Sequence, residues 1–237
     1  MAAATNGTVS SAHGQNGTSG GATPPKLPFE ETIIDLDTPR PHWYLDINPG
    51  GLVPSIKYTV PGLVDSEIIY ESAIVAQFLC DAFPSHLLPS SHEDPLAPLG
   101  RARINFFVDT WSSKLSAFQM AAMKAPVDEK QAKVDEWAAA VEKEIEPLLA
   151  DAGPFFGGSK ELTFAEAIVA PFLLRWYAFA NDKYVPASLV RKLDALPNCS
   201  KWSKAVREKE SVTKIWDREN YVEAFAKKYG NVLVAMR

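Results

Sequence analysis

Hydrophobic residues along the chain follow two periods, and the change between them divides the sequence. Between residues 29 and 72 the apolar residues form short runs rich in β-branched side chains and bounded by Pro and Gly, a pattern typical of β-strands. From Ala73 onward they recur every three or four residues, which is typical of amphipathic helices. The pattern predicts a fold of the class α/β plus all-α.

The α/β unit is predicted to contain three strands, at residues 29–37, 53–60 and 66–72. Pro61 and Gly62 lie between the last two strands and suit a tight connection. A helix is expected to begin at Ala73, with one apolar stripe formed by Ile74, Phe78 and Ala82 and with Val75 and Leu79 beside it.

The second unit is expected to be entirely helical. It follows a segment rich in Pro and Ser at residues 83–98. Thr163 and Glu166 form a capping box that opens an apolar helix ending near residue 180. The other helices are predicted at residues 99–123, 128–150, 188–196, 197–210 and 218–229. The predicted organisation is a disordered tail at 1–26, an α/β domain at 27–85, a linker at 86–98 and a helical domain at 99–237.

Residues 1–26 are dominated by Ala, Gly, Ser, Thr and Asn, so they offer too little apolar surface to offset the entropy of ordering. They lack both the apolar core of a secretory signal and the arginines of a transit peptide. Only two cysteines, Cys80 and Cys199, occur in the chain, which fits a reducing compartment. We therefore expect a cytoplasmic protein.

The composition of the chain argues against several classes of binding partner. The 237 residues are 46% hydrophobic and 22% charged with a net charge of −5, so no basic surface is offered to nucleic acid or anionic lipid. The longest apolar run, residues 167–174, is far shorter than the ~20 residues that cross a bilayer. The four histidines show no metal-ligand spacing. We expect no nucleic acid, membrane or metal partner.

Two motifs in the α/β unit suggest binding chemistry. Val53-Pro54 follows an Asn-Pro-Gly-Gly turn and leads into a strand, and a cis bond there would present the Val53 main chain to a bound peptide. Glu71 and Ser72 lie where a strand gives way to a helix, so the helix end could bind an anion while Glu71 pairs with an ammonium group. The alternatives are a common dipeptide and simple helix capping.

A third feature is Arg40, which stands between two prolines ahead of Trp43 and Tyr44. Its guanidinium could clamp a carboxylate, and the alternative is a solvated surface charge.

In this order and spacing, "IIDLDTPRPHWYLDINPGGLVPSIKY" and "EIIYESAIVAQFLCDAFP" resemble the glutathione transferase superfamily, nearest its omega-like and related fungal members. The resemblance implies a thioredoxin-like domain and an all-helical domain, a homodimer, and glutathione as co-substrate. It implies that Val53, with Pro54, binds the cysteinyl backbone of glutathione and that Glu71 and Ser72 hold its γ-glutamyl end. Arg40 would reach the glycyl carboxylate.

The resemblance begins at the second strand of that domain. It implies that the first strand and helix are absent, and with them the usual Cys, Ser or Tyr that contacts the glutathione sulfur. Three explanations stay open: a misjudged gene start or splice, a degenerate domain stabilised by a dimer partner, or an enzyme whose tail closes over the site. The catalytic residue is therefore unknown, and Cys80 is expected to serve packing or dimer contact.

Two classes of function follow. The first is an enzyme that adds the glutathione thiolate to an activated double bond of a small hydrophobic electrophile. It then either releases the conjugate or catalyses cis–trans isomerisation, in a specialised-metabolite pathway. The electrophile would contact Phe107, Trp111, Leu115 and Trp176, although aromatic residues at helical spacing are more often core. The alternative is a non-catalytic domain for binding or dimerisation.

Overall fold

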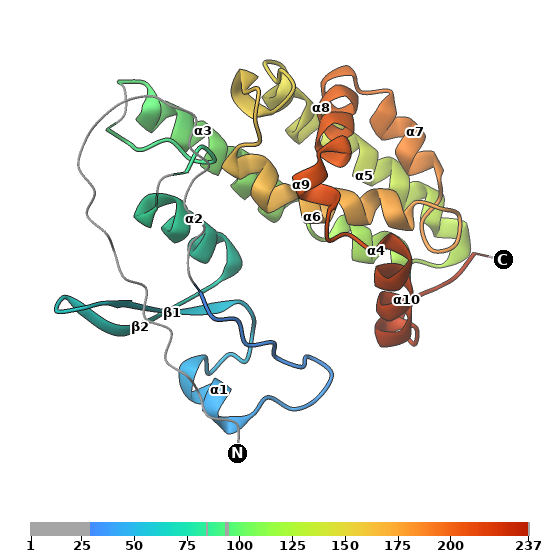
Figure 1. Cartoon of the computed structure of the whole chain (residues 1–237). Helices are drawn as coiled ribbons and strands as arrows, with labels where there is room; N and C mark the ends of the chain where they lie inside the picture. The colour runs from blue at the N-terminus through green and yellow to red at the C-terminus, as the bar shows by residue number, and fades with distance from the viewer. Residues whose placement is uncertain (1–28, 84, 93–94, 237) are drawn as a thin grey trace. The chain divides into compact units, whose positions relative to one another are not determined.

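The computed structural model describes residues 29–83, 85–92 and 95–236 of the chain (Figure 1). The predicted tail at residues 1–26 lies outside the described residues. The chain divides into two compact units, with the division between Ser85 and His86. The first unit contains strands and helices and the second contains helices, so the predicted class of α/β plus all-α is confirmed.

The first unit contains an antiparallel hairpin of β1 (Ser55–Val60) and β2 (Val64–Tyr70), preceded by α1 (His42–Ile47) and followed by α2 (Ser72–Ala82). The strands pair in a register that places Ser55 opposite Tyr70. In the connection, Gly62 has a φ of +77°, which a residue without Cβ adopts at little cost. Two of the three predicted strands and the tight turn are therefore confirmed.

The strand predicted at residues 29–37 is not formed. This segment has neither helical nor strand structure, and most of its side chains are exposed. A strand needs a neighbour to accept and donate its main-chain hydrogen bonds. In the described part of the chain, β1 and β2 pair only with each other. The composition favoured a strand, but pairing decides whether one exists.

The helix predicted from Ala73 is α2, and the stripe chosen for its buried face is partly wrong. Ile74 is 58% exposed, whereas Val75 is 6% exposed. Phe78 packs edge-on against Tyr58 of β1 with ring centroids 4.8 Å apart. The buried side of α2 is therefore rotated away from Ile74, because it is set by contact with the hairpin.

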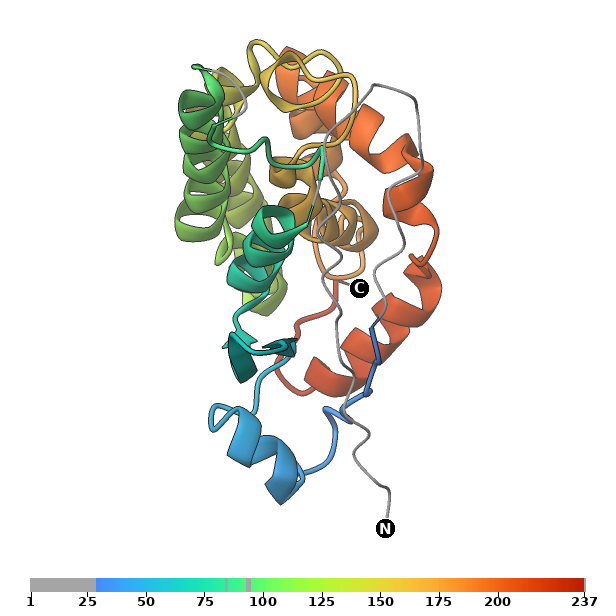
Figure 2. The ribbon, with the colours of Figure 1, turned by 60° about the vertical axis from the view of Figure 1, so that its left-hand side comes forward.

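The second unit is built around α6 (Phe164–Phe179), which packs against α3 (Ala97–Thr110), α8 (Pro197–Glu208), α9 (Glu210–Thr213) and α10 (Arg218–Tyr229). Figure 2 shows the same helices from a second direction. The remaining helices are α4 (Phe118–Lys124), α5 (Lys130–Glu144) and α7 (Ser188–Asp194). Short 3-10 turns lie at η2 (Val127–Glu129), η3 (Glu146–Leu149) and η4 (Phe156–Gly158).

The long helix predicted at residues 99–123 is interrupted. A π-helical turn, η1 (Trp111–Leu115), separates α3 from α4. A π turn spans more residues than an α turn and often marks a functional position. Trp111 and Leu115, at its two ends, are both buried. The predicted helix is therefore two helices joined by a wider turn.

A buried lysine holds the end of α4. Lys130 is fully buried, and its Nζ donates to the main-chain oxygens of Ala122 at 2.8 Å, Met123 at 3.1 Å and Tyr184 at 2.8 Å. Ala122 and Met123 lie in the last turn of α4, where carbonyl groups lack intrahelical partners. Removal from water lowers the pKa of Lys130 below its usual value.

A buried carboxylate organises the start of α6. Glu166 is fully buried and accepts hydrogen bonds from the Phe156 N–H, the Thr163 N–H, the Thr163 hydroxyl and the Trp202 indole, at 2.6–2.8 Å. Two of these four bonds come from Thr163, and the one from its N–H is half of the predicted capping box, whose other half is a main-chain N–H donating to the Thr163 side chain. The other two reach η4 and α8, so one side chain connects three parts of the unit.

We expect Glu166→Gln to destabilise the helical unit by on the order of 3 kcal/mol, because an amide N–H would face donors that now meet a carboxylate oxygen. Chemical denaturation followed by circular dichroism measures the change. Glu136→Gln is the control, since Glu136 pairs with Lys133 on the surface and its loss should cost less than about 0.5 kcal/mol. Equal stabilities for the two variants would contradict the central role of Glu166.

Candidate functional site

Two buried polar side chains of the first unit position the loop between α1 and β1. Asn48 donates from Nδ2 to the Leu52 oxygen at 2.8 Å and to Ser55 Oγ at 3.1 Å. The Tyr44 hydroxyl donates to the Leu52 oxygen at 2.5 Å and lies 3.2 Å from Ser55 Oγ. These contacts fix the residues on both sides of Val53 and Pro54.

The Val53-Pro54 peptide bond is cis. Val53 is 44% exposed, and its main chain makes no hydrogen bond within the described residues. Its N–H and C=O groups are therefore free to pair with the main chain of a bound peptide, as an added strand would.

Glu71 and Ser72 stand at the start of α2, as predicted, and both are exposed. Glu71 has a φ of +73°, which is sparsely populated by residues other than glycine and is often found at functional sites. Its carboxylate has no partner among the residues described. The first N–H groups of α2 have no intrahelical acceptors, so they can donate to a bound anion. This anion-binding helix end and the free carboxylate of Glu71 are therefore adjacent.

Arg40 already holds main-chain oxygens. Its Nε donates to Gly51 at 2.9 Å, and one terminal nitrogen donates to Asp35 at 2.8 Å and to Thr38 at 2.9 Å. Gly51 has a φ of +62°, and a Cβ there would lie 3.2 Å from Arg40 Cγ, so glycine permits this approach. Arg40 therefore ties together the two ends of the segment around α1. Only its other terminal nitrogen is left for a ligand.

The four residues predicted to contact an organic substrate lie in the core of the helical unit. Phe107, Trp111, Leu115 and Trp176 are at most 3% exposed. Trp111 and Trp176 stack with ring centroids 4.4 Å apart. Their spacing reflects packing, so the expectation that they line a surface pocket is corrected.

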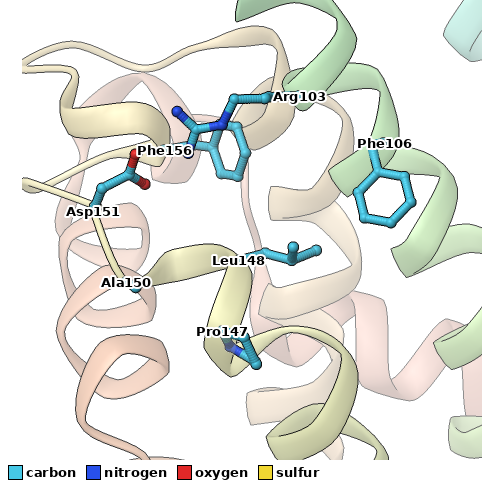
Figure 3. Close-up of a pocket in the computed structure, with 7 residues that line it drawn as sticks. All are labelled: Arg103, Phe106, Pro147, Leu148, Ala150, Asp151 and Phe156. Carbon is cyan, nitrogen blue, oxygen red and sulfur yellow. Dashed lines mark hydrogen bonds and ion pairs between the residues drawn. The ribbon is translucent and has the colours of Figure 1, made fainter.

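A pocket of about 370 Å³ lies between α3, the segment around η3, and η4 (Figure 3). Phe106, the neighbour of Phe107, is 60% exposed and forms one wall. Arg103 and Asp151 form an ion pair of 2.6 Å at its edge, so the charge of each is already balanced. The lining residues are Arg103, Phe106, Pro147, Leu148, Ala150, Asp151 and Phe156.

A second surface of aromatic character lies on α6 and α10, and we call it the aromatic face. Tyr221, Phe225 and Tyr229 follow one another at four-residue steps along α10 and are only partly buried. The Arg175 guanidinium lies 4.4 Å from the Phe172 ring centroid and 6.0 Å from that of Tyr221. No carboxylate of the described residues pairs with Arg175. Sequence reasoning missed this face, although the four-residue spacing was visible.

Cys199 is not placed to act as a nucleophile. Cys199 is buried, and burial raises the pKa of its thiol to about 12, with Glu146 and Asp194 adding to the effect. Its N–H donates to Glu146 Oε2 at 2.7 Å. Cys80 lies half-buried near the end of α2.

In the described residues, no group of three or more His, Cys, Asp or Glu side chains could hold a metal ion. No helix in the same residues has the length and apolar character needed to span a membrane.

Comparison with known proteins identifies the family. Residues 26–82 match the family model described as "Glutathione S-transferase, N-terminal domain", and residues 102–204 match "Glutathione S-transferase, C-terminal domain". Together these matches cover well over half of the chain. The chain therefore belongs to the glutathione S-transferase family, as its motifs predicted.

Individual proteins similar to this chain are glutathione transferases as well. Glutathione S-transferase DHAR2 of Arabidopsis thaliana is 27% identical over 186 residues, covering 78% of this chain and 75% of the relative. The crystal structure of rice GST1 in complex with glutathione is 25% identical with a TM-score of 0.65, covering 86% of this chain and 88% of that one. Glutathione transferase Omega 2S of Trametes versicolor, solved with 2,4-dihydroxybenzophenone, is 26% identical with a TM-score of 0.58, covering 82% and 85%.

We expect Cys199 to resist alkylation by iodoacetamide at pH 8 in the folded protein, because a thiol with a pKa of about 12 is only about one part in ten thousand thiolate. Peptide mass spectrometry measures the labelling rate. The same protein in concentrated urea is the control, and labelling there should be roughly a thousandfold faster. Rapid labelling of Cys199 in the native protein would show that its environment is wrongly assigned.

Proposed function

We propose that this chain is a glutathione-dependent transferase whose first unit binds glutathione. The observation that carries the proposal is the free carboxylate of Glu71 beside Ser72 at the start of α2. The γ-glutamyl end of glutathione bears an ammonium and a carboxylate on one carbon, and this pair of sites complements both charges.

The other groups of the first unit complement the rest of the tripeptide. The free N–H and C=O groups of Val53 match the cysteinyl main chain, which is recognised in an extended conformation. Tyr44 and Asn48 keep the Val53 loop in place without touching the ligand. Arg40 has one terminal nitrogen left for the glycyl carboxylate, so we assign it a small part in affinity. A rice relative was solved in complex with glutathione, which supports this assignment.

The proposed reaction is addition of the glutathione sulfur to an activated double bond. The thiol loses its proton, the sulfur bonds to the β carbon, and the electron pair of the double bond moves toward the activating carbonyl. Protonation of the α carbon then gives the conjugate. The alternative is that the intermediate rotates about the bond between its α and β carbons, which is now a single bond, and then expels the thiolate. The double bond returns as the other isomer, and glutathione is recovered.

For the organic substrate we propose the aromatic face. Partly exposed rings offer stacking surface, and the unpaired Arg175 favours an anionic or strongly polarised aromatic group. The pocket beside Phe106 is a weaker candidate, because its arginine is neutralised by Asp151. A Trametes versicolor relative was solved with a hydroxylated benzophenone, which is a molecule of this type. We further propose a cytoplasmic homodimer acting in specialised metabolism.

A second function is favoured by one observation. Near Val53, the Tyr44 hydroxyl and Ser55 Oγ are engaged with each other and with the Leu52 oxygen and Asn48, so neither is free to activate a thiol. A domain that binds glutathione or a partner without catalysis satisfies the same geometry. Glutathione binding without turnover would select this alternative.

We expect Glu71→Gln to weaken glutathione binding roughly ten- to a hundredfold, because it removes a charge-assisted hydrogen bond while keeping the shape. Isothermal titration calorimetry measures the affinity. Glu67→Gln on β2 is the matched control, an exposed acidic residue of the same unit, and should bind as wild type does. If Glu71→Gln binds glutathione equally well, the proposed site is wrong.

We expect Arg175→Gln and Tyr221→Ala each to raise the KM for an enone carrying an aryl carboxylate, by on the order of tenfold, since each removes one contact of the aromatic face. Steady-state kinetics with two enones that differ only in the carboxylate separates the charge from the stacking. Phe106→Ala is the control for the pocket. A raised KM in Phe106→Ala alone would move the organic substrate to that pocket.

A further inference from the structure

The helix α10 carries three rings of the aromatic face, yet none of its residues is buried. Its rings touch the core through Phe179, whose ring centroid lies 4.9 Å from that of Phe225 and 6.1 Å from that of Tyr221. At its start, Arg218 donates to the Ala178 oxygen at 3.4 Å, which is long for a hydrogen bond. Figure 1 and Figure 2 both show α10 at the rim of the helical unit. A helix with so little burial needs further contacts to fix its position.

Further contacts come from the segment that follows α10. The Val234 N–H donates to the Met123 oxygen at 3.0 Å, and the Met236 N–H donates to the Lys183 oxygen at 2.8 Å. Alternate N–H groups of an extended segment point the same way, so one edge of residues 234–236 is bonded at both positions. We call these two bonds the clasp. It joins the segment to the last turn of α4 and to the turn that precedes α7.

Lys130 fixes the groups to which the clasp attaches. The Met123 oxygen accepts from Lys130 Nζ as well as from Val234. The Tyr184 oxygen also accepts from Nζ, and Tyr184 is the neighbour of Lys183. The third bond of Nζ goes to the residue before Met123. An ammonium group has three donors, so all of them are used. Lys130 and the clasp therefore cross the same junction between α4 and the turn.

The sequence explains why these acceptors are open. In a continuous helix the Ala122 oxygen would accept from residue 126 and the Met123 oxygen from residue 127. Residue 126 is proline, which has no N–H, and α4 ends two residues before it. A buried carbonyl without a donor is costly. The carbonyl groups of the last turn are therefore free to bind Lys130 and Val234.

We propose that Lys130 is a positioning residue for the organic substrate and that it acts through the clasp. Its ammonium group fixes the Met123 and Tyr184 carbonyls, the clasp pins residues 234–236 beside them, and α10 is thereby held with its rings in place. The inference rests on the proposed use of the aromatic face. Lys130 touches no substrate itself, because its side chain is fully buried.

The test removes one main-chain donor at a time. Val234→Pro and Met236→Pro each delete one bond of the clasp, because proline has no N–H. Hydrogen exchange of the α10 amides, measured by mass spectrometry, should become on the order of tenfold faster in each variant. Ala235→Pro is the matched control, since the Ala235 N–H makes no main-chain hydrogen bond within the described residues. Its exchange should stay as in wild type.

Lys130→Met should also speed exchange in α10. Combined with Val234→Pro it should add little, because both changes act on the Met123 carbonyl. In steady-state kinetics the proline variants should raise the KM for the aryl carboxylate enone, as Tyr221→Ala does, and leave kcat unchanged. A general loss of folded protein would lower kcat instead, so the split identifies positioning. If Lys130→Met does not fold, the proline variants decide.

The proposal is overturned if α10 exchanges in Val234→Pro and Met236→Pro as it does in Ala235→Pro. It is also overturned if the effects of Lys130→Met and Val234→Pro add independently, or if the KM for the enone stays at the wild-type value. Failure of the proposed function is a separate result, in which wild type neither binds glutathione nor converts the enone. The exchange measurement needs no substrate and would still decide whether the clasp holds α10.

Discussion

The carboxylate of Glu166 is the interaction on which the helical unit depends. It is fully buried, and four donors from η4, the α6 cap and α8 converge on it. A buried charge is tolerated only when its hydrogen-bonding capacity is filled, so η4, the α6 cap and α8 must all be in place around the carboxylate. Once α6 is fixed in this way, its apolar surface can pack against its neighbours, and Trp176 of α6 can stack on Trp111.

The first unit is organised differently, by polar contacts to the main chain. Asn48 and Tyr44 hold Leu52 and Ser55, while Arg40 holds Gly51. Few side chains are removed from water, so the loop that carries Val53 is positioned mainly by hydrogen bonds. Such contacts place a main-chain recognition site accurately with little apolar burial.

Much of this architecture could be predicted from local sequence patterns. The capping box at Thr163, the turn at Gly62 and the placement of Glu71 and Ser72 all follow from interactions between near neighbours. The prediction of a strand at residues 29–37 was wrong, because a strand requires a pairing partner and composition does not reveal whether one is present. The aromatic residues around Trp111 were misassigned for a similar reason, since helical spacing does not distinguish a buried face from a binding face. The contacts of Arg40 and Lys130 join distant segments, and no local signal marks them.

The π turn at Trp111–Leu115 lets this stretch of the chain carry one extra residue without losing its helical phase. Each residue advances an α-helix by about 100°, and a π turn accommodates an additional residue by widening, so the helices on either side keep the orientation that a regular helix would give them. Deleting one residue from this turn should therefore leave Met123 of α4, which is fully buried, facing the core. The same deletion in the middle of α3 would rotate the rest of that helix by about 100° and turn buried side chains toward water. The π turn is therefore the part of this helical stretch that best tolerates a change of chain length.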